Sequence, residues 1–392
     1  MHIPEPSLGK IARAFLHLGL TAFGGLAMVE PMRQMTVDKQ GWLHQADFLD
    51  GLALCQLLPG ATVVQLGTYI GYRLRQVAGA LIAAAAFILP AFILMLVLSS
   101  LYFKYTDISW VQAISRGMGS VVIALLLQAL WRLGQPVRKH WLDAVIAVLA
   151  LGAFWLRVNF LLVFLVAGLL RMALGLWLVA GHDSQNPVLA STIPRLRQTL
   201  ALVILTLFGV ALAVWVLGRL QPDLGKMAKI FLKIGVVSFG GGYAMIPILQ
   251  WDVVNSLNWL TLKQFLDGIL LGFITPGPII ILATFVGYKV YGLIGAGVAT
   301  IAIFLPPILL IIFLTPYYQR VKETWWMRQA IQGILAALVG MLGLVTLQMG
   351  RAALGGLPDL ILTAATSMAL IVFEVNLLLI VPVVIALSLV IF

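Results

Sequence analysis

Two proline-glycine motifs interrupt otherwise apolar stretches of the sequence. They read Pro59-Gly60 and Thr275-Pro276-Gly277-Pro278. Proline breaks a helix but is favoured at the first position of a new one, so each motif predicts a half-helix that starts at membrane depth. The free N–H groups and positive dipole end of a half-helix bind an anion without any charged side chain. A simple hinge is the alternative interpretation of each motif.

Two glycine clusters lie inside apolar stretches at matching places, in Phe23-Gly24-Gly25 and Phe239-Gly240-Gly241. Glycine within a helix costs about 1 kcal/mol relative to alanine, so the clusters predict a kink or a close approach of two backbones. Unwinding there would expose backbone N–H groups to a solute. Small-residue packing between membrane helices is the alternative.

Two aspartates, Asp50 and Asp267, occur in the same Phe-Leu-Asp-Gly sequence. A carboxylate within a membrane span is costly and usually faces the bundle interior, which makes each aspartate a candidate proton carrier. Stabilisation by the positive dipole at a helix N-terminus is the structural alternative.

Basic residues also recur in pairs, with Arg73 matching Lys289 and His17 matching Lys233. Either pair could neutralise a dianion in a site of low dielectric constant. The alternative is that these long side chains extend to the lipid headgroups.

Signatures of enzymes are absent from the sequence. The five histidines (His2, His17, His44, His140 and His182) have no metal-ligand spacing, and there is no phosphate-binding GxxxxGK loop or Gly-x-Ser-x-Gly elbow. We therefore expect no enzyme, no metal and no cofactor, and an ion gradient or exchange as the energy source. The single Cys55 excludes an intrachain disulfide.

Composition indicates a membrane protein. Of the 392 residues, 62% are hydrophobic and 10% are charged, against about 25% charged in soluble domains. Apolar runs of about 20 residues, enough to cross a bilayer as helices, recur along the chain. The net charge of +11 comes from scattered basic residues rather than a run, which disfavours nucleic acid and suits both membrane anchoring and an anionic solute.

The elements that carry these motifs form two copies of one unit. Residues 15–31, FLHLGLTAFGGLAMVEP, align with residues 231–247, FLKIGVVSFGGGYAMIP, 216 positions later. Glycine, proline, aspartate and tryptophan matches continue for about a hundred residues. We predict a first domain at 1–181, a linker with one extra helix at 182–225, and a second domain at 226–392.

The predicted fold is an all-α multi-pass membrane protein. If each opening span (11–32 and 226–248) and each proline-glycine segment crosses once, there are about thirteen transmembrane helices. The two copies are then inverted repeats, as in many transporters. The competing topology makes each proline-glycine segment a re-entrant hairpin, which on this count leaves the copies parallel. Loop charge favours a cytoplasmic N-terminus.

The ordered motifs resemble those of chromate ion transporters of the two-domain type. The resemblance rests on Gln56-Leu-Leu-Pro-Gly60, on Gln65 to Arg73, and on FGGGYAMIP, QFLDG, TPGP and ATFVGY in the second copy. It implies chromate export driven by the proton motive force, and adds Gln56 and Gln65 to the candidate binding residues. Leu26, Val29, Ala61 and Phe273 depart from the family pattern, which bears on substrate and rate.

From this resemblance we expect a transporter in a bacterial-type inner membrane that exports chromate or a sulfate-like oxyanion. Its partners would be the oxyanion and the lipid bilayer, with no nucleic acid, and a homodimer is left open. Transport of sulfate, molybdate or another anion, including uptake, is the alternative. A membrane scaffold without transport is disfavoured by the repeated breaks in the spans.

Overall fold

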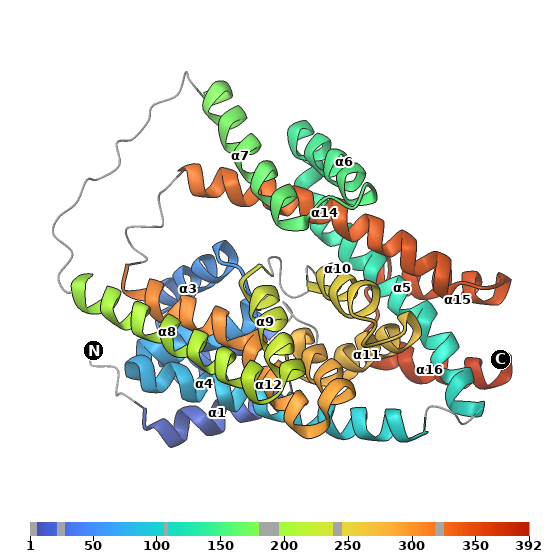
Figure 1. Ribbon diagram of the computed structural model, residues 1–392, viewed down its shortest axis with the longest axis horizontal. Coiled ribbons are helices and arrows are strands. Elements are labelled where there is room, and N and C mark those ends of the chain that lie inside the picture. The colour runs from blue at the N-terminus through green and yellow to red at the C-terminus, as the bar shows by residue number, and fades with distance from the viewer. Residues whose placement is uncertain are drawn as a thin grey trace.

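The computed structural model describes residues 6–21, 28–105, 109–179, 196–237, 245–317 and 325–391. Within these ranges the chain is helical, with turns and no strand, which confirms the all-α prediction (Figure 1). The first copy contains α1 (Leu8–Thr21), α2 (Val29–Arg33), the π-helix η2 (Gln34–Lys39), α3 (Gln45–Leu57), α4 (Thr62–Tyr105), α5 (Ser109–Arg138), α6 (Trp141–Trp155) and α7 (Phe160–Val179).

The helix α8 (Leu196–Leu220) precedes the second copy, which repeats the same order of elements. It contains α9 (Pro222–Val237), α10 (Met245–Gln250), the π-helix η3 (Trp251–Ser256), α11 (Leu262–Ile274), the short 3₁₀ helices η4 (Ile279–Ile281) and η5 (Thr315–Tyr317), α12 (Leu282–Leu314), α14 (Trp325–Ala353), α15 (Leu357–Ile371) and α16 (Leu377–Ile391).

Each copy opens with two helices that fold back on one another. Lys10 near the start of α1 lies 5.8 Å above the ring of Trp42, which follows η2, so the two arms run in opposite directions. In the second copy Lys233 of α9 pairs with Asp252 of η3 at 2.7 Å. The prediction of one opening span at 11–32 is therefore wrong.

The proline-glycine segment is a second hairpin. Asp47 in the first turn of α3 forms an ion pair with Arg73 at 2.7 Å, and its carbonyl accepts a hydrogen bond from the hydroxyl of Tyr69. The start of α3 thus lies beside the first part of α4. This is the re-entrant alternative rather than a broken helix that crosses once, and it removes the premise for thirteen crossings. Breaks are present at both motifs, as predicted, because α3 ends at Leu57 and α11 ends at Ile274.

Helix α4 turns back on itself a few residues later. Gln76 has φ 49° and the repeat-related Gly292 in α12 has φ 55°, and neither conformation is helical. A Cβ atom on Gly71 would lie within 2.3 Å of the carbonyl oxygen of Gly79, so only glycine permits this crossing of the two parts of α4. The chain continues from this turn into the long apolar part of α4.

The two copies pack against each other reciprocally. Helices α4 and α12 pack on one another, while α6 and α7 pack on α14, and α15 and α16 pack on α5 (Figure 1). Gly60 contacts Pro307 of the second copy, and Gly277 contacts Ala91 of the first. Because positions 91 and 307 are themselves 216 residues apart, these contacts describe a pseudo-two-fold arrangement.

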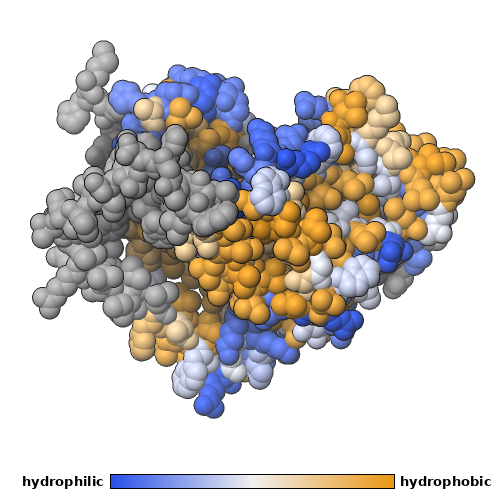
Figure 2. Space-filling view, turned by 90° about the horizontal axis from the view of Figure 1, so that it is seen from above, coloured by the Kyte–Doolittle hydropathy of each residue, from blue (hydrophilic) through white to orange (hydrophobic). Residues whose placement is uncertain are grey.

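The surface agrees with a multi-pass membrane protein. Four helices within the described residues are long and apolar enough to cross a bilayer: Thr62–Tyr105, Gln112–Arg138, Ile279–Leu314 and Gln329–Ala353. Exposed side chains such as Leu149, Leu162 and Ile301 are 60%, 53% and 67% accessible, although they are fully apolar. Figure 2 shows a broad hydrophobic area bordered by hydrophilic patches. Such a surface is stable against lipid rather than water.

Candidate functional site

A basic pocket lies where the second copy meets the turn between α6 and α7 of the first. It has a volume of about 270 Å³ and adjoins a cavity of about 660 Å³ that shares several of its walls. Three basic side chains and four amides reach the two cavities: Arg157, Lys233, Arg351, Asn159, Gln250, Asn255 and Gln348. Asp252 is the carboxylate in their lining, so the pocket carries an excess of positive charge.

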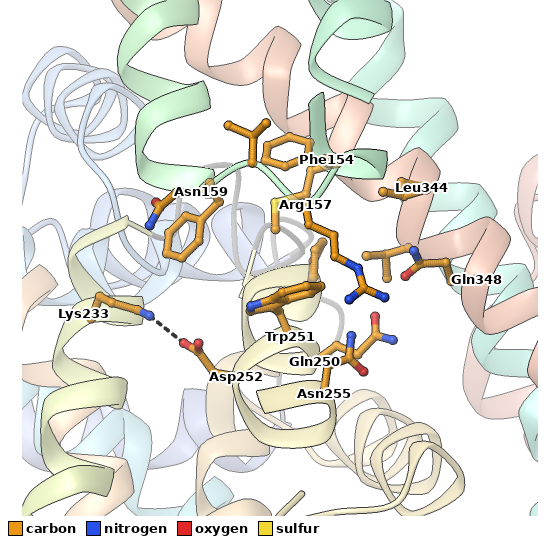
Figure 3. A pocket seen from close by; sticks show the side chains of 15 residues that line it. Phe154, Arg157, Asn159, Lys233, Gln250, Trp251, Asp252, Asn255, Leu344 and Gln348 are labelled. Atoms are coloured by element: carbon orange, nitrogen blue, oxygen red, sulfur yellow. Dashed lines mark ion pairs between the residues drawn. The ribbon is translucent and has the colours of Figure 1, made fainter. Parts of the chain in front are cut away.

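The α6–α7 turn positions Arg157. Its backbone has φ 61°, a left-handed conformation that ends α6, and its N–H donates to the carbonyl of Phe154 at 3.0 Å. Figure 3 shows the guanidinium extending from this turn toward Gln250, Asn255 and Gln348. Non-glycine residues adopt this conformation rarely, and such strain concentrates at functional sites.

Lys233 and Asp252 form the second feature of the pocket. Their ion pair measures 2.7 Å, and the two side chains are 36% and 13% exposed. The ammonium of Lys233 also lies 5.0 Å above the ring of Phe160. Asp252 therefore offsets one positive charge, whereas no ion pair among the described residues neutralises Arg157 or Arg351.

The amides come from a change of helix type. Helix α10 becomes the π-helix η3 at Trp251, and Gln250 and Asn255 stand at its two ends. Single π-helical turns are uncommon and often mark functional sites. Amide N–H groups and guanidinium groups are donors that suit a tetrahedral oxyanion. No group of histidine, cysteine and carboxylate side chains in the described chain could hold a metal ion.

The predicted residues at the proline-glycine motifs lie elsewhere, at the contact between the two copies. Gln65 is fully buried, and its amide donates to the carbonyl of Pro59 at 2.7 Å, so it bridges the break. Gln56 is exposed in the last turn of α3, and the hydroxyl of Thr275 donates to the carbonyl of Leu271. Gly60, Pro276, Gly277 and Pro278 are buried.

The other predicted residues are also apart from the pocket. Arg73 pairs with Asp47, and the ammonium of Lys289 lies 5.0 Å above the ring of Phe103. Phe23-Gly24-Gly25 and Phe239-Gly240-Gly241 lie outside the described residues, so their role stays a prediction.

Asp267 connects the two copies. It is 5% exposed, and its carboxylate accepts hydrogen bonds from the hydroxyls of Ser115 (2.6 Å) and Tyr102 (2.7 Å) of the first copy. Asp267 is the sixth residue of α11, beyond the first turn, so stabilisation by the helix dipole is wrong for it. Thr261 and Gln264 form a capping box at that helix start instead. Asp50, its counterpart, is half-buried in α3.

From the sequence, Lys233 was identified as the repeat-related match of His17, but Arg157, Gln250, Asn255 and Gln348 were not predicted as site residues. One signal was available, because Arg157-Val-Asn159 is a polar turn between two apolar runs, and surface loops often carry binding residues. The amides gave no signal, since single polar residues on separate helices are common.

Comparison with known proteins agrees with the predicted resemblance. The family model described as Chromate transporter matches residues 9–175 and 225–391, one match for each copy. Chromate transport proteins of Cupriavidus metallidurans and Pseudomonas aeruginosa are 30% and 33% identical, covering 95% and 91% of this chain and 90% and 85% of their own. An uncharacterized transporter of Methanocaldococcus jannaschii is 33% identical over 88% of this chain and 85% of its own. No solved structure matches.

Proposed function

The chain belongs to the chromate transporter family, and on this premise we propose that it exports chromate or a similar tetrahedral oxyanion from the cytoplasm across an inner membrane. The observation that carries the proposal is the pocket with Arg157, Lys233 and Arg351 against one carboxylate. Two oxyanion charges would offset the two unneutralised cations. The relatives in Cupriavidus and Pseudomonas are named chromate transport proteins, which supports chromate as the anion.

The pocket would hold the anion mainly through Arg157. A guanidinium presents several donors in one plane and binds tetrahedral oxyanions through paired hydrogen bonds. Gln250, Asn255 and Gln348 would supply further donors, while Lys233 would exchange Asp252 for the anion as the site opens. The predicted glycine clusters and proline-glycine breaks then belong to the path between the copies, where backbone N–H groups pass the anion onward.

The topology that we propose has nine membrane crossings rather than the thirteen expected from the sequence. Four long apolar helices and five shorter ones (141–155, 160–174, 208–220, 357–371 and 377–391) remain in the described chain once the arms of the hairpins are left out. Five of these nine precede the second copy. An odd number places the copies in opposite orientations, so the inverted repeat is retained and alternating access follows from one copy rocking against the other.

Proton coupling would involve Asp267. It is a buried carboxylate whose hydrogen-bond donors, Ser115 and Tyr102, belong to the other copy, so movement between the copies would change its surroundings. Asp267→Asn is expected to leave anion exchange intact but to abolish accumulation driven by a pH gradient. The same change at the less enclosed Asp50 is expected to have the smaller effect. Equal loss in both variants would contradict the assignment to Asp267.

The test is chromate uptake into everted membrane vesicles energised by respiration. Wild-type protein should accumulate chromate, an uncoupler should abolish this, and excess sulfate should compete. Arg157→Gln should lower the apparent affinity about 10- to 100-fold, since a charged hydrogen bond contributes roughly 1.5–3 kcal/mol. Arg138→Gln is the matched control, because Arg138 lies 4.3 Å above the ring of Trp131, away from the pocket. Unchanged affinity in a correctly inserted Arg157→Gln protein would refute the proposed site.

A further inference from the structure

The opening hairpin of the first copy contains a second basic cavity. It has a volume of about 530 Å³ and lies between α1 and the α2–η2 arm. The polar side chains in its lining are Lys10, Arg13, His17, Thr21, Gln34 and Lys39 together with Gln40, and no carboxylate of the described residues lines it. Three basic side chains, Lys10, Arg13 and Lys39, thus line one space.

This cavity is the repeat-related counterpart of the pocket at Lys233. His17 matches Lys233, Gln34 matches Gln250 and Lys39 matches Asn255, each 216 positions apart. Both cavities also border a π-helical segment, η2 in the first copy and η3 in the second. The wall of the cavity that the opening hairpin forms, with an amide at the same helix junction, is therefore present in both halves of the duplicated fold.

The charge of the two cavities differs at one position. Asp252 of the second copy corresponds to Thr36, a fully buried residue whose hydroxyl donates to the carbonyl of Met32 at 2.7 Å. The carboxylate that offsets Lys233 therefore has no equivalent here. Among the ion pairs of the described residues, none involves Arg13, His17 or Lys39, and the nearby acids Glu30 and Asp38 both pair with Arg33.

We propose that the α1–η2 cavity is a second oxyanion site, on the face of the membrane opposite to the first. This inference rests on the proposed function, in which inverted copies place equivalent cavities on opposite faces. The ligand class is a small tetrahedral dianion such as chromate or sulfate, attracted by three cations without an internal carboxylate. With a cytoplasmic N-terminus, this cavity is where the anion enters, and the pocket at Arg157 is where it leaves.

Binding stoichiometry tests the inference. Equilibrium dialysis of radiolabelled sulfate against the purified, delipidated full-length protein should find two sites per chain. Arg13→Gln with Lys39→Gln should leave one site, Arg157→Gln should leave the other, and their combination should leave none. Arg138→Gln should retain both. A single site in the wild-type protein that is unchanged by Arg13→Gln with Lys39→Gln would overturn the second site while sparing the proposed function. A single wild-type site that is lost in Arg13→Gln with Lys39→Gln but kept in Arg157→Gln would support the second site and overturn the proposed function at Arg157.

A lipid phosphate offers the same chemistry as free sulfate, so a separate binding experiment must distinguish the two. If short-chain phosphatidylglycerol binds through Arg13 and Lys39 but sulfate does not, the cavity is a lipid headgroup site and the proposal fails.

Sidedness provides the last check, since Cys55 is fully buried. Gln40→Cys should react with a membrane-impermeant thiol reagent from the cytoplasmic face, and Asn159→Cys from the other, each at least several-fold more slowly with sulfate. Reaction of both from one face would overturn the placement.

Discussion

Asp143 and Asp359 lie 216 residues apart at equivalent positions of the two copies, yet their partners come from different places. Asp143 receives a 2.6 Å ion pair from Arg171 of α7, whose guanidinium also donates to Gln329 and Gln332. Asp359 receives a 3.2 Å ion pair from Arg116 of α5. Gln332 occupies the position in the second copy that Arg116 occupies in the first. Gln332 contacts the Asp143–Arg171 ion pair, and Arg116 forms the ion pair with Asp359, so these two equivalent positions serve the two charge centres.

Duplication preserved the positions of the buried carboxylates but not the way in which their charge is neutralised. Arg171 and Asp143 are 9% and 5% exposed, whereas Arg116 is half exposed although Asp359 is fully buried. The first copy therefore encloses a complete ion pair, and the second leaves its cation in reach of water. Each centre joins helices from both copies, because α7 packs on α14 and α15 packs on α5.

Removing the two carboxylates should separate these centres most clearly. Asp143→Ala leaves a buried arginine without a counter-charge and should destabilise the protein by about 3–5 kcal/mol. Asp359→Ala should cost less, about 1–3 kcal/mol, because Arg116 can turn to water. Thermal unfolding in one detergent, followed by tryptophan fluorescence, measures both. Equal losses would contradict the comparison, and Asp143→Leu with Arg171→Leu should recover much of the stability.

The two proline-glycine breaks should differ next. Gly60 has φ 130°, and a Cβ atom there would lie 2.4 Å from the Cβ atom of Pro307; at Gly277 the corresponding atom would lie 2.8 Å from the Cβ atom of Ala91. Gly60→Ala should therefore lose about 1–3 kcal/mol and more than Gly277→Ala. Pro307→Gly removes the Cβ atom that the new side chain would meet and should rescue part of the loss. No rescue would show that backbone strain alone sets the cost.

The bridge across the first break should have an intermediate effect. Gln65 donates to the carbonyl of Pro59, whereas the second copy has apolar Ile281 and Leu282 at this place. Gln65→Leu should cost about 1 kcal/mol, since one buried hydrogen bond is lost. The same unfolding measurement applies, with Gln56→Leu as the control on an exposed position of the neighbouring helix. A larger loss in the control would refute the structural role of Gln65.

The smallest effect is expected at a threonine pair. Thr284 and Thr300 hydroxyls meet at 2.7 Å in α12, while the first copy has Thr68 and Ala84 at these positions. The Thr68 hydroxyl donates instead to the carbonyl of Val64 at 2.7 Å. Thr300→Ala should cost about 0.5–1 kcal/mol, because Thr284 can then bond within its own helix in the same way. A loss of several kcal/mol would indicate that Thr300 does more than connect the two parts of α12.

Local features of the fold were predictable. The duplication, the helical spans and the breaks at Pro59-Gly60 and Pro276-Gly277 followed from apolar run length and from the backbone limits of proline and glycine, which act within a few residues. The fold-back of each hairpin was not predictable, because a short apolar helix followed by a turn has the same sequence pattern as a broken span. The ion pair between Asp47 and Arg73, and the contact of Lys10 with Trp42, decide it.

Run lengths, repeats and proline-glycine motifs were enough to predict a duplicated, all-helical membrane protein with basic residues available for an anion. Which of these basic residues converge depends on how the helices pack. Arg157 lies in the α6–α7 turn, Lys233 in α9 and Arg351 in α14, so they are separated by up to nearly two hundred residues. They meet only because the copies exchange helices across the pseudo-two-fold arrangement. Local propensity sets where helices begin and end, whereas the partner of a buried charge depends on which helices pack together.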